Sequence, residues 1–424
     1  MRPQARDQDP YPEVYPNVER PKLAPKGAVY TGNPARGGDR KGWVEVESTA
    51  DLSKPQPPPP ESGAWTSTNA TVQVLVSAFR DELCGKTLFN LFTKAAFPNR
   101  VLTSVVQQNA DGDVDCADRM CALLKDPAMC ARRRRQVRIF NVPSDEAKGP
   151  VHARSMGSRM VEATSDFCMQ TDSHMDFSPD WDLHLLKFWS DARNEYAVLS
   201  TYVSDLRQLG KCLNNVYEVP HLCQVIKSTG LVPRNSQAKA ARMLKAPLLT
   251  TVWAAGLSFA RCHFERRVPN DPNLPFVFDG EEFSRTLRGW THGYDFYTPP
   301  RTVVGHNYNR QRKGHWQVRR KNINFLVHLP CFLSRRDVAP PCVWLPKMSD
   351  TSGGSQLANR RLQLLLGLPV ATTVMPRRDA SGHLGKTHSA EGDSESDLVT
   401  ERAAVQRGRY GLGTRRTVTY LVLP

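Results

Sequence analysis

The chain has 424 residues, of which 40% are hydrophobic, and it carries a formal charge of +15. This length fits one large domain or two ordinary ones. The charge favours an anionic partner such as nucleic acid, an acidic membrane or a phosphorylated ligand, unless it serves only solubility and basic tails. No run approaches the roughly 18 apolar residues of a membrane helix, and the polar start at residues 1–8 excludes a signal peptide. We therefore expect no membrane segment and a cytoplasmic protein, or a Golgi protein if the start codon is mis-assigned.

Composition divides the chain into three parts. Residues 1–68 hold twelve of the 32 prolines and few apolar runs, which predicts a disordered or polyproline segment. A folded domain is expected over residues 69–370. Residues 371–424 are expected to form a mostly disordered tail, although a weak alternation at 417–423 indicates a terminal strand or an appended segment.

Strand and helix patterns follow one another in the first half of the expected domain. Alternating or β-branched runs predict strands at 71–77, 100–107, 137–142 and from 167. Helical spacing predicts helices at 84–96 and from 148 to about 163. The order strand, helix, strand, strand, helix, strand predicts an α/β fold with a mostly parallel central sheet flanked by helices.

The second half gives a weaker pattern. A helix is predicted at 181–189, and strands are predicted at 197–203 and 250–260. A loop at 278–285 is expected to enter a helix with its acids in the first turn, and a short helix is predicted at 360–368. Residues 204–245 are basic and irregular and predict no element.

Ten cysteines are present, without the paired spacing of a zinc site. Cys116, Cys121 and Cys130 lie close together in the sequence, so a local disulfide or a metal site is an alternative there. We expect scattered reduced thiols, as is usual in a cytoplasmic protein.

Asp172 and His174 follow a buried strand and form the strongest chemical signal. Side chains alternate along a strand, so an Asp-x-His triplet places a carboxylate and an imidazole on the same side. His306 follows a β-branched run and is expected at a strand end. One Asp and two His suit manganese or a similar ion, whereas the alternatives are an ordinary loop and a surface histidine.

Other polar residues are expected around the same crevice, because ligands bind beyond the carboxyl ends of parallel strands. Ser77, Arg80 and Asp81 follow the first strand, and Arg80 or Arg154 is expected to hold phosphate unless it forms a structural salt bridge. Asp81 is expected to accept from a uracil or ribose group, to begin the following helix, or both.

Two further stretches carry candidate residues. Glu281 and Glu282 follow Gly280, and we expect one of these acids to face the site; the alternative is compensation of the helix dipole. The segment 290–297 suits sugar stacking through Trp290 and its tyrosines, with His292 near a diphosphate or metal. Its alternative is a corner of the core.

Taken together, these stretches resemble the polypeptide α-N-acetylglucosaminyltransferases that modify a hydroxyproline of a cytosolic ubiquitin-ligase adaptor, or Ser and Thr in related Golgi enzymes. A more distant similarity is to the mucin-type polypeptide N-acetylgalactosaminyltransferases. The resemblance covers about residues 70–368 and rests on 76–84 (VSAFRDELC) with Thr87, 149–154 (GPVHAR), 170–175 (QTDSHM) with Trp181 and Asp182, 256–264 (GLSFARCHF), 268–272 (VPNDP), 276–283 (FVFDGEEF), 290–297 (WTHGYDFY) and 305–306 (GH).

The resemblance implies a GT-A glycosyltransferase fold for residues 69–370, UDP-N-acetylglucosamine as donor, Mn²⁺ or Mg²⁺ as metal and retention of anomeric configuration. The similarity to the galactosaminyltransferases suggests Asp172, His174 and His306 as the metal ligands, with Arg154 near the donor and Glu281 or Glu282 near the sugar. Together with the residues singled out above, the candidate donor-binding residues are Ser77, Arg80, Asp81, Arg154, Trp290 and His292, and the candidate catalytic acids are Glu281, Glu282 and Asp172.

Two alternatives remain open from the sequence. One is a transferase of another sugar or to another acceptor, since donor choice depends on pocket shape. The other is a basic nucleic-acid-binding protein, which predicts strongly salt-dependent binding. The second alternative leaves the acids at 172, 281 and 282 unexplained, so we expect a UDP-sugar and an acceptor protein, such as a ubiquitin-ligase adaptor, as partners and no nucleic acid.

Overall fold

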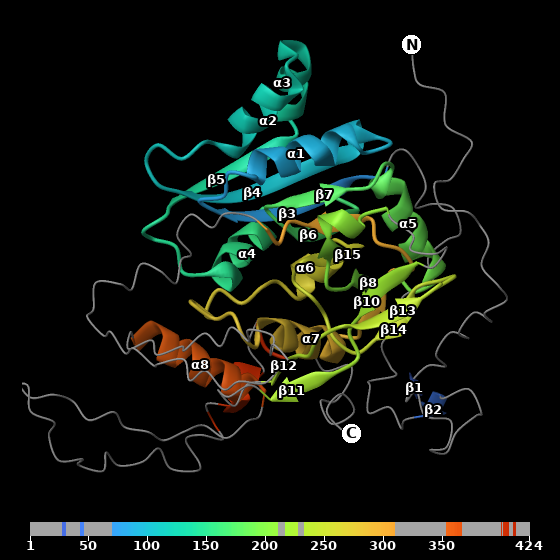
Figure 1. Cartoon of the computed structure of the whole chain (residues 1–424). Helices are drawn as coiled ribbons and strands as arrows, with labels where there is room; N and C mark the ends of the chain where they lie inside the picture. The colour runs from blue at the N-terminus through green and yellow to red at the C-terminus, as the bar shows by residue number, and fades with distance from the viewer. Residues whose placement is uncertain are drawn as a thin grey trace, which may run out of the picture.

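The computed structural model describes residues 28–30, 43–45, 70–210, 217–227, 233–309, 353–366, 400, 402–406 and 410–412. Most of the predicted segment 1–68, most of the tail 371–424 and the whole of the expected strand at 417–423 lie outside these residues. Within the described part, helices lie on both sides of one large sheet (Figure 1).

The central sheet has eight strands, in the order β14-β16-β8-β15-β6-β3-β4-β5. Strands β14 and β15 run opposite to the other six, so the sheet is mostly parallel. From one edge to the other the strands are β14 (Leu248–Thr250), β16 (Asp295–Thr298), β8 (Ala197–Ser200), β15 (Leu257–Arg261), β6 (Phe167–Asp172), β3 (Val72–Phe79), β4 (Val101–Asn109) and β5 (Val137–Pro143).

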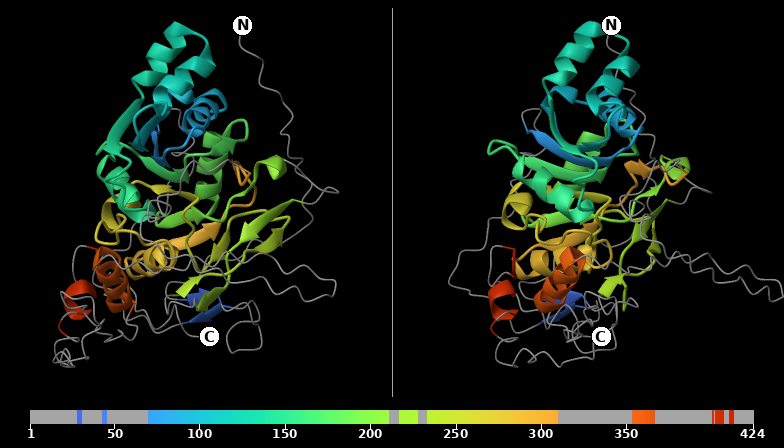
Figure 2. Two further views of the ribbon diagram at one scale, coloured as in Figure 1. Left: turned by 60° about the vertical axis from the view of Figure 1, so that its left-hand side comes forward. Right: turned by 90° about the vertical axis from the view of Figure 1, so that its left-hand side faces the viewer.

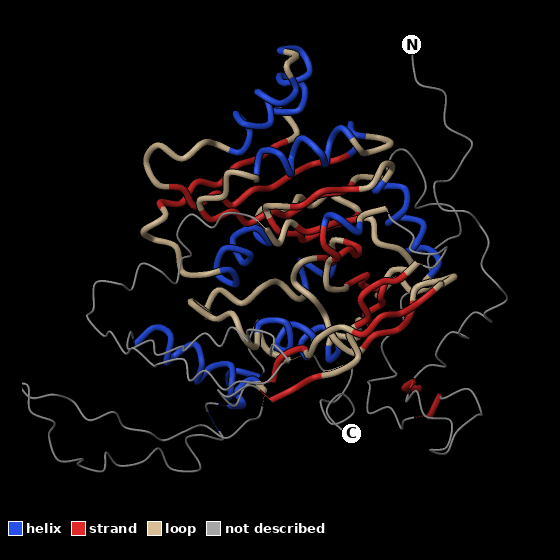
Figure 3. The backbone as a smooth tube through the Cα atoms, viewed as in Figure 1, coloured by secondary structure: helices blue, strands red, loops and turns tan. Residues whose placement is uncertain are grey.

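Two layers of helices cover the sheet, as the tube view of Figure 3 makes visible. Helices α1 (Cys84–Thr93) and α5 (Trp181–Asp191) contribute buried side chains to the core cluster that holds alternate residues of β3, β6, β8 and β15. The intervening residues of β8, β15 and β16 pack with α6 (His263–Arg267) in a second cluster on the opposite face. Helices α4 (Pro150–Arg159) and α7 (Glu281–Thr291) lie on that second face, where α4 contacts α6 and the α7 side chain Arg285 lies over the Phe264 ring.

Smaller elements complete the described part. Helices α2 (Cys116–Leu124) and α3 (Pro127–Arg134) project beyond the β5 edge, and α8 (Gly353–Leu365) lies toward the other end of the molecule (Figure 2). A three-stranded sheet has the order β7-β17-β9. The remaining bounds are β7 (Met175–Phe177), β17 (Val304–His306), β9 (Ser204–Asp205), β10 (Glu218–His221), β13 (Lys239–Arg242), β11 (Val225–Lys227), β12 (Pro233–Asn235), β1 (Ala28–Tyr30), β2 (Trp43–Glu45) and the 3₁₀ turns η2 (Pro98–Arg100) and η3 (Leu206–Gln208).

The strands and helices predicted for the first half are present, but the predicted order lacks α2 and α3, which lie between β4 and β5. The predictions for the second half are partly wrong. The run at 250–260 is not one strand: β14 ends at Thr250 and β15 begins at Leu257. Between them the chain turns inward, because Trp253 is fully buried and its neighbours fill a separate part of the core. The described part of the region 204–245, for which no element was predicted, contains five short strands outside the main sheet. Strand β9 joins the three-stranded sheet, and β10 to β13 form two two-stranded ladders, β10 with β13 and β11 with β12.

The expectation of scattered reduced thiols is wrong for six of the ten cysteines. Disulfides join Cys84 to Cys116, Cys121 to Cys130, and Cys168 to Cys262. Two of these bonds span 32 and 94 residues, because α1 packs on α2 and β6 pairs with β15. Sequence spacing does not reveal such long-range contacts.

Among the helices that the structure describes, none combines the length and apolar character that a bilayer crossing requires.

Candidate active site

The three predicted metal ligands lie together where two strands from different sheets end. Asp172 is the last residue of β6, and His174 lies in the turn between β6 and β7. His306 is the last residue of β17, which pairs with β7 so that His306 lies opposite Met175. One ligand atom from each of Asp172, His174 and His306 lies within 4.8 Å of the others. The structure therefore brings together residues that are up to 134 positions apart (306 minus 172).

The geometry of this set fits a divalent ion. The two Nε2 atoms of His174 and His306 are 2.8 Å apart on rings that are nearly perpendicular, at 88°. His306 Nε2 lies 3.6 Å from Asp172 Oδ2. An ion bound at about 2.1 Å holds neighbouring ligands about 3 Å apart, and two imidazoles with one carboxylate are a common set for ions that keep open positions.

Asp81 lies directly behind His174. Its Oδ2 atom is 2.7 Å from His174 Nδ1 and accepts a hydrogen bond of 2.7 Å from Ser173 Oγ. Its Oδ1 atom accepts from the Leu83 backbone N–H at the entry to α1. The expected role at the start of the helix is thus present, whereas the carboxylate is turned toward the metal set and is only 4% exposed.

A line of alternating charges connects the metal set to α7. Arg154 Nη2 lies 3.0 Å from Asp172 Oδ1, and Arg154 Nη1 lies 2.6 Å from both carboxylate oxygens of Glu281. Burial alone would raise the pKa of Asp172, but Arg154, His174 and His306 together hold it below its usual range. Burial would likewise lower the pKa of Arg154, but Glu281 and Asp172 raise it above its usual range. Asp172 is therefore kept ionised, as a metal ligand must be.

Glu282 points away from this line and sits in a different polar setting. Its Oε2 accepts from Tyr202 Oη at 2.9 Å and from Asn235 Nδ2 at 3.0 Å, and its Oε1 accepts from the Ala255 backbone N–H at 2.9 Å. Burial, with the neighbouring charge of Glu281, outweighs these bonds and raises the pKa of Glu282 to about 7. Of the two adjacent acids, Glu281 is the one joined to the metal set.

The start of α7 is placed by backbone features. Gly280 precedes the helix with φ of 92°, a conformation that favours glycine. The loop before β15 also approaches closely, because a side chain at Gly256 would meet Asp172 Oδ2 at 3.6 Å. These contacts bring the ends of β6, α7 and the 253–256 loop to one place.

The structure does not bring every predicted residue to the metal set. Ser77 is half-buried and lies opposite Asp172 in the β3–β6 register, so it is close to the site. Arg80, with φ of 47°, holds Asp113, with Nε 2.7 Å from Oδ2, which is the structural salt bridge foreseen as its alternative.

Trp290 and His292 lie at the far end of α7 from Glu281. At a rise of 1.5 Å per residue, nine residues separate Trp290 from Glu281 by about 13 Å along the axis. His292 Nδ1 donates to the Arg288 carbonyl at 2.7 Å. Tyr294, from the same predicted sugar-stacking segment, is fully buried and stacks edge-on with Phe264. For Tyr294 the alternative of a core corner is the arrangement found.

Sequence reasoning missed Tyr308. Its ring lies 4.0 Å from the His306 ring, centroid to centroid, and its hydroxyl donates to the Val203 carbonyl at 2.7 Å. It is 57% exposed. Tyr308 lies in the turn that follows β17, two residues after His306, so its position just beyond an expected strand end was the signal that could have found it.

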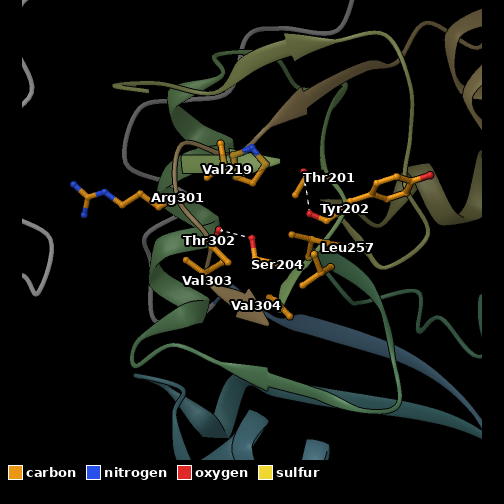
Figure 4. Close-up of a pocket in the computed structure, with 11 residues that line it drawn as sticks. Thr201, Tyr202, Ser204, Val219, Leu257, Arg301, Thr302, Val303 and Val304 are labelled. Atoms are coloured by element: carbon orange, nitrogen blue, oxygen red, sulfur yellow. Dashed lines mark hydrogen bonds between the residues drawn. The ribbon is translucent and has the colours of Figure 1, made fainter. Parts of the chain in front are cut away.

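A small pocket lies beside these segments (Figure 4). It is lined by residues 201–204 and 301–304 together with Val219, Leu257 and Pro299, and a hydrogen bond of 3.4 Å joins Ser204 and Thr302 across it. The lining is largely apolar. One lining segment contains Tyr202, the hydrogen-bond partner of Glu282, and the other ends two residues before His306. The pocket therefore adjoins the site without containing the metal set.

Comparison with known protein families decides the class of the protein. The model of the family described as glycosyltransferase (GlcNAc) matches residues 71–130 and 118–422. These matches cover well over half of the chain. The chain belongs to the glycosyltransferase (GlcNAc) family. The protein is thus a glycosyltransferase. Its eight-stranded, mostly parallel sheet with helices on both faces confirms the predicted α/β fold.

Comparison with individual proteins adds less. No curated protein matches the chain. Among solved structures, the chain is similar to GalNAc-T7 in complex with UDP, GalNAc and Mn²⁺ (15% identity, TM-score 0.41, 56% of this chain and 43% of that one). It is also similar to the mannosyltransferase PcManGT from Pyrobaculum calidifontis with GDP-Man and Mn²⁺ (15%, 0.37, 61% and 62%) and to S. aureus TarS 1–349 (11%, 0.35, 56% and 60%). The chain thus spans less than two thirds of each of these solved chains, and TM-scores this low say nothing about substrates or residue roles.

Proposed function

We propose that this glycosyltransferase moves N-acetylglucosamine from UDP-N-acetylglucosamine to a hydroxyl group of an acceptor protein, with retention of anomeric configuration. The acceptor hydroxyl belongs to Ser, Thr or hydroxyproline. The observation that carries the proposal is the convergence of Asp172, His174 and His306, with ligand atoms within 4.8 Å of one another, where β6 and β17 end.

Mn²⁺ or Mg²⁺ is the proposed metal, held by Asp172, His174 and His306. When bound, it neutralises the charge of the diphosphate leaving group. Asp172 accepts from Arg154 through Oδ1 and presents Oδ2 toward His306. Arg154 therefore holds this carboxylate ionised and oriented toward the metal position.

The acids of α7 are proposed to act at the sugar. Glu281 is 3% exposed, and its carboxylate accepts a hydrogen bond from Arg154. Because Arg154 also contacts Asp172, this pair holds the start of α7 next to the metal set. The acceptor hydroxyl attacks the sugar on the same face from which the UDP leaves, and the departing phosphate takes the proton of that hydroxyl. We assign no side-chain nucleophile.

The disulfides bear on the compartment and therefore on the acceptor. Three disulfides within one domain are typical of an oxidising compartment and rare in the cytosol. We therefore favour the Golgi lumen, with Ser or Thr as acceptor, over the cytoplasm with a ubiquitin-ligase adaptor. Thiol alkylation of protein from its own cells, followed by mass spectrometry, tests this proposal. We expect Cys84, Cys121 and Cys168 to be unmodified, and their alkylation would favour the cytoplasm instead.

Release of UDP tests the proposed function. The protein is incubated with UDP-N-acetylglucosamine, UDP-N-acetylgalactosamine or UDP-glucose, with Mn²⁺ or with a chelator, and with Ser/Thr or hydroxyproline peptides. We expect peptide-dependent release with the first donor and Mn²⁺ only, and loss of release in Asp172→Asn. Equal release with another donor, or full release with the chelator, contradicts the proposed donor or the proposed metal.

A further inference from the structure

His174 differs from the other two members of the metal set because it lies in a turn. Asp172 and His306 are each the last residue of a hydrogen-bonded strand, whereas residues 173 and 174 lie between β6 and β7. A turn residue needs support from elsewhere to hold its ring within the tolerance of metal coordination, about 0.5 Å.

One source of support is the imidazole contact with Asp81. His174 Nε2 faces His306, so a bound metal requires a free electron pair on Nε2 and the proton on Nδ1. Asp81 Oδ2, at 2.7 Å, accepts a hydrogen bond from Nδ1–H and thereby stabilises this tautomer. Ser173 Oγ donates to the same oxygen and keeps the carboxylate turned toward the ring.

The other source is the hydroxyl of Thr87 in α1, which is 1% exposed. Thr87 Oγ1 accepts from the Met175 backbone N–H at 2.8 Å and donates to the Ser173 carbonyl at 2.8 Å. A single hydroxyl therefore ties the backbone immediately before and immediately after His174.

Helix α1 is itself well anchored, so it can act as a fixed support. The disulfide from Cys84 attaches its first turn to α2, and Leu88 and Leu91 are fully buried in the main core. The Leu83 N–H bonds to Asp81 Oδ1, which joins Asp81 to the same helix.

We propose that Asp81 and Thr87 are positioning residues that hold His174 in the tautomer and place needed to bind the metal. This inference rests on the proposed metal-dependent function and names two residues outside its ligand set. An anchoring role at the start of α1 needs only Oδ1 of Asp81, whereas Oδ2 is used by His174 and Ser173. Outer partners of this kind are typically worth about 10- to 100-fold in metal affinity.

The first measurement is the affinity of the full chain for Mn²⁺ in the absence of donor. Electron paramagnetic resonance follows the concentration of free Mn²⁺. We expect Asp81→Asn to weaken binding by about 10- to 100-fold. The substitution removes the negative charge opposite His174, and an amide that donates to Nδ1 leaves the ring proton of His174 on Nε2, the atom that binds the metal. Thr87→Val is expected to weaken binding by about tenfold, and Thr87→Ser, which keeps the hydroxyl, to restore it.

Two matched variants separate positioning from general damage. Asp166→Asn changes an acid at the opposite end of β6, where Oδ2 accepts from the Thr71 backbone N–H. Thr93→Val removes an exposed hydroxyl of the same helix that bonds to the Phe89 carbonyl. Both should bind Mn²⁺ like the wild type, and circular dichroism checks that every variant is folded.

The tautomer gives a second readout that does not depend on metal. In ¹⁵N-histidine spectra of the metal-free protein we expect His174, assigned by its loss in His174→Ala, to carry its proton on Nδ1, and to lose this preference in Asp81→Ala. If His174→Ala weakens Mn²⁺ binding but Asp81→Asn and Thr87→Val do not, the inference is overturned and the proposed function stands. If His174→Ala leaves Mn²⁺ binding unchanged, the proposed metal site fails and the inference fails with it.

Discussion

The two ends of helix α7 lie in different surroundings. At its amino-terminal end, Glu281 is joined through Arg154 to Asp172, and Glu282 is held by three hydrogen-bond donors. Beyond its carboxyl-terminal end, Tyr294 is fully buried against other aromatic rings. Both ends are rich in residue types that bind sugars and metals. Residue type alone therefore does not locate the site, because the direction of α7 relative to the strand ends decides which of its two ends lies beside the metal set.

The largest expected effect is that of Arg154→Ala at the amino-terminal end. Removing the guanidinium leaves two carboxylates of low exposure without their shared cation, which should cost about 3–5 kcal/mol of unfolding free energy. Transfer should fall by about 10²- to 10³-fold, the loss typical of a preorganised charge in a site. Urea unfolding and UDP release measure the two effects. Arg138→Ala, which removes an exposed pair with Glu162, is the control and should cost under about 1 kcal/mol.

Tyr294→Ala should affect stability alone. The ring is fully buried between α6 and β16, so its loss should cost about 3–5 kcal/mol. Transfer per folded molecule, measured at a temperature well below the melting point, should change by less than about threefold, since the ring lies in the core. A large fall in that specific activity would place the segment in the sugar site and remove the contrast between the two ends.

Glu282 should make stability depend on pH. Its pKa is raised from the ordinary value of 4.5 to about 7, so the folded state binds the proton more tightly than the unfolded state. Its contribution is complete below pH 4.5, is lost as pH rises toward 7, and is constant above that. The difference amounts to at most about 3 kcal/mol. Glu282→Gln should flatten this part of the stability curve in urea titrations between pH 4.5 and 8, and an unchanged slope would show that another group titrates.

The smallest effect is expected for His292→Ala at the carboxyl-terminal end. The variant loses one hydrogen bond to the Arg288 carbonyl, worth about 0.5–1.5 kcal/mol. The KM for the donor should change by less than about threefold, because the residue lies at the far end of α7 from Glu281. A tenfold rise in that KM would place His292 in the donor site and show that both ends of α7 contribute to it.

The sequence predicted what depends on local pattern. The strands that carry Ser77 and Asp172 are apolar and regular, so their carboxyl ends and the Asp-x-His spacing were readable. The motifs shared with the glycosyltransferases predicted His306 as a metal ligand and predicted the enzyme class. The pairing of Asp81 with His174 was not readable, because it joins two turns 93 residues apart.

Other failures have the same physical origin. The interruption between β14 and β15 follows from burial of Trp253, which a strand-like sequence does not reveal. The disulfides depend on which helices and strands meet. The roles expected of Trp290 and His292 came from residue type and a shared motif, whereas their distance along α7 is set by helix geometry.

If Asp172, His174 and His306 hold one divalent ion, crystals grown with Mn²⁺ and measured near the manganese absorption edge should show it at this position. We predict an anomalous peak within about 2.3 Å of Asp172 Oδ2 and both histidine Nε2 atoms, and no such peak in His306→Ala. A fully occupied Mn²⁺ elsewhere in the crystal, with this position empty at saturating metal, would contradict this metal assignment.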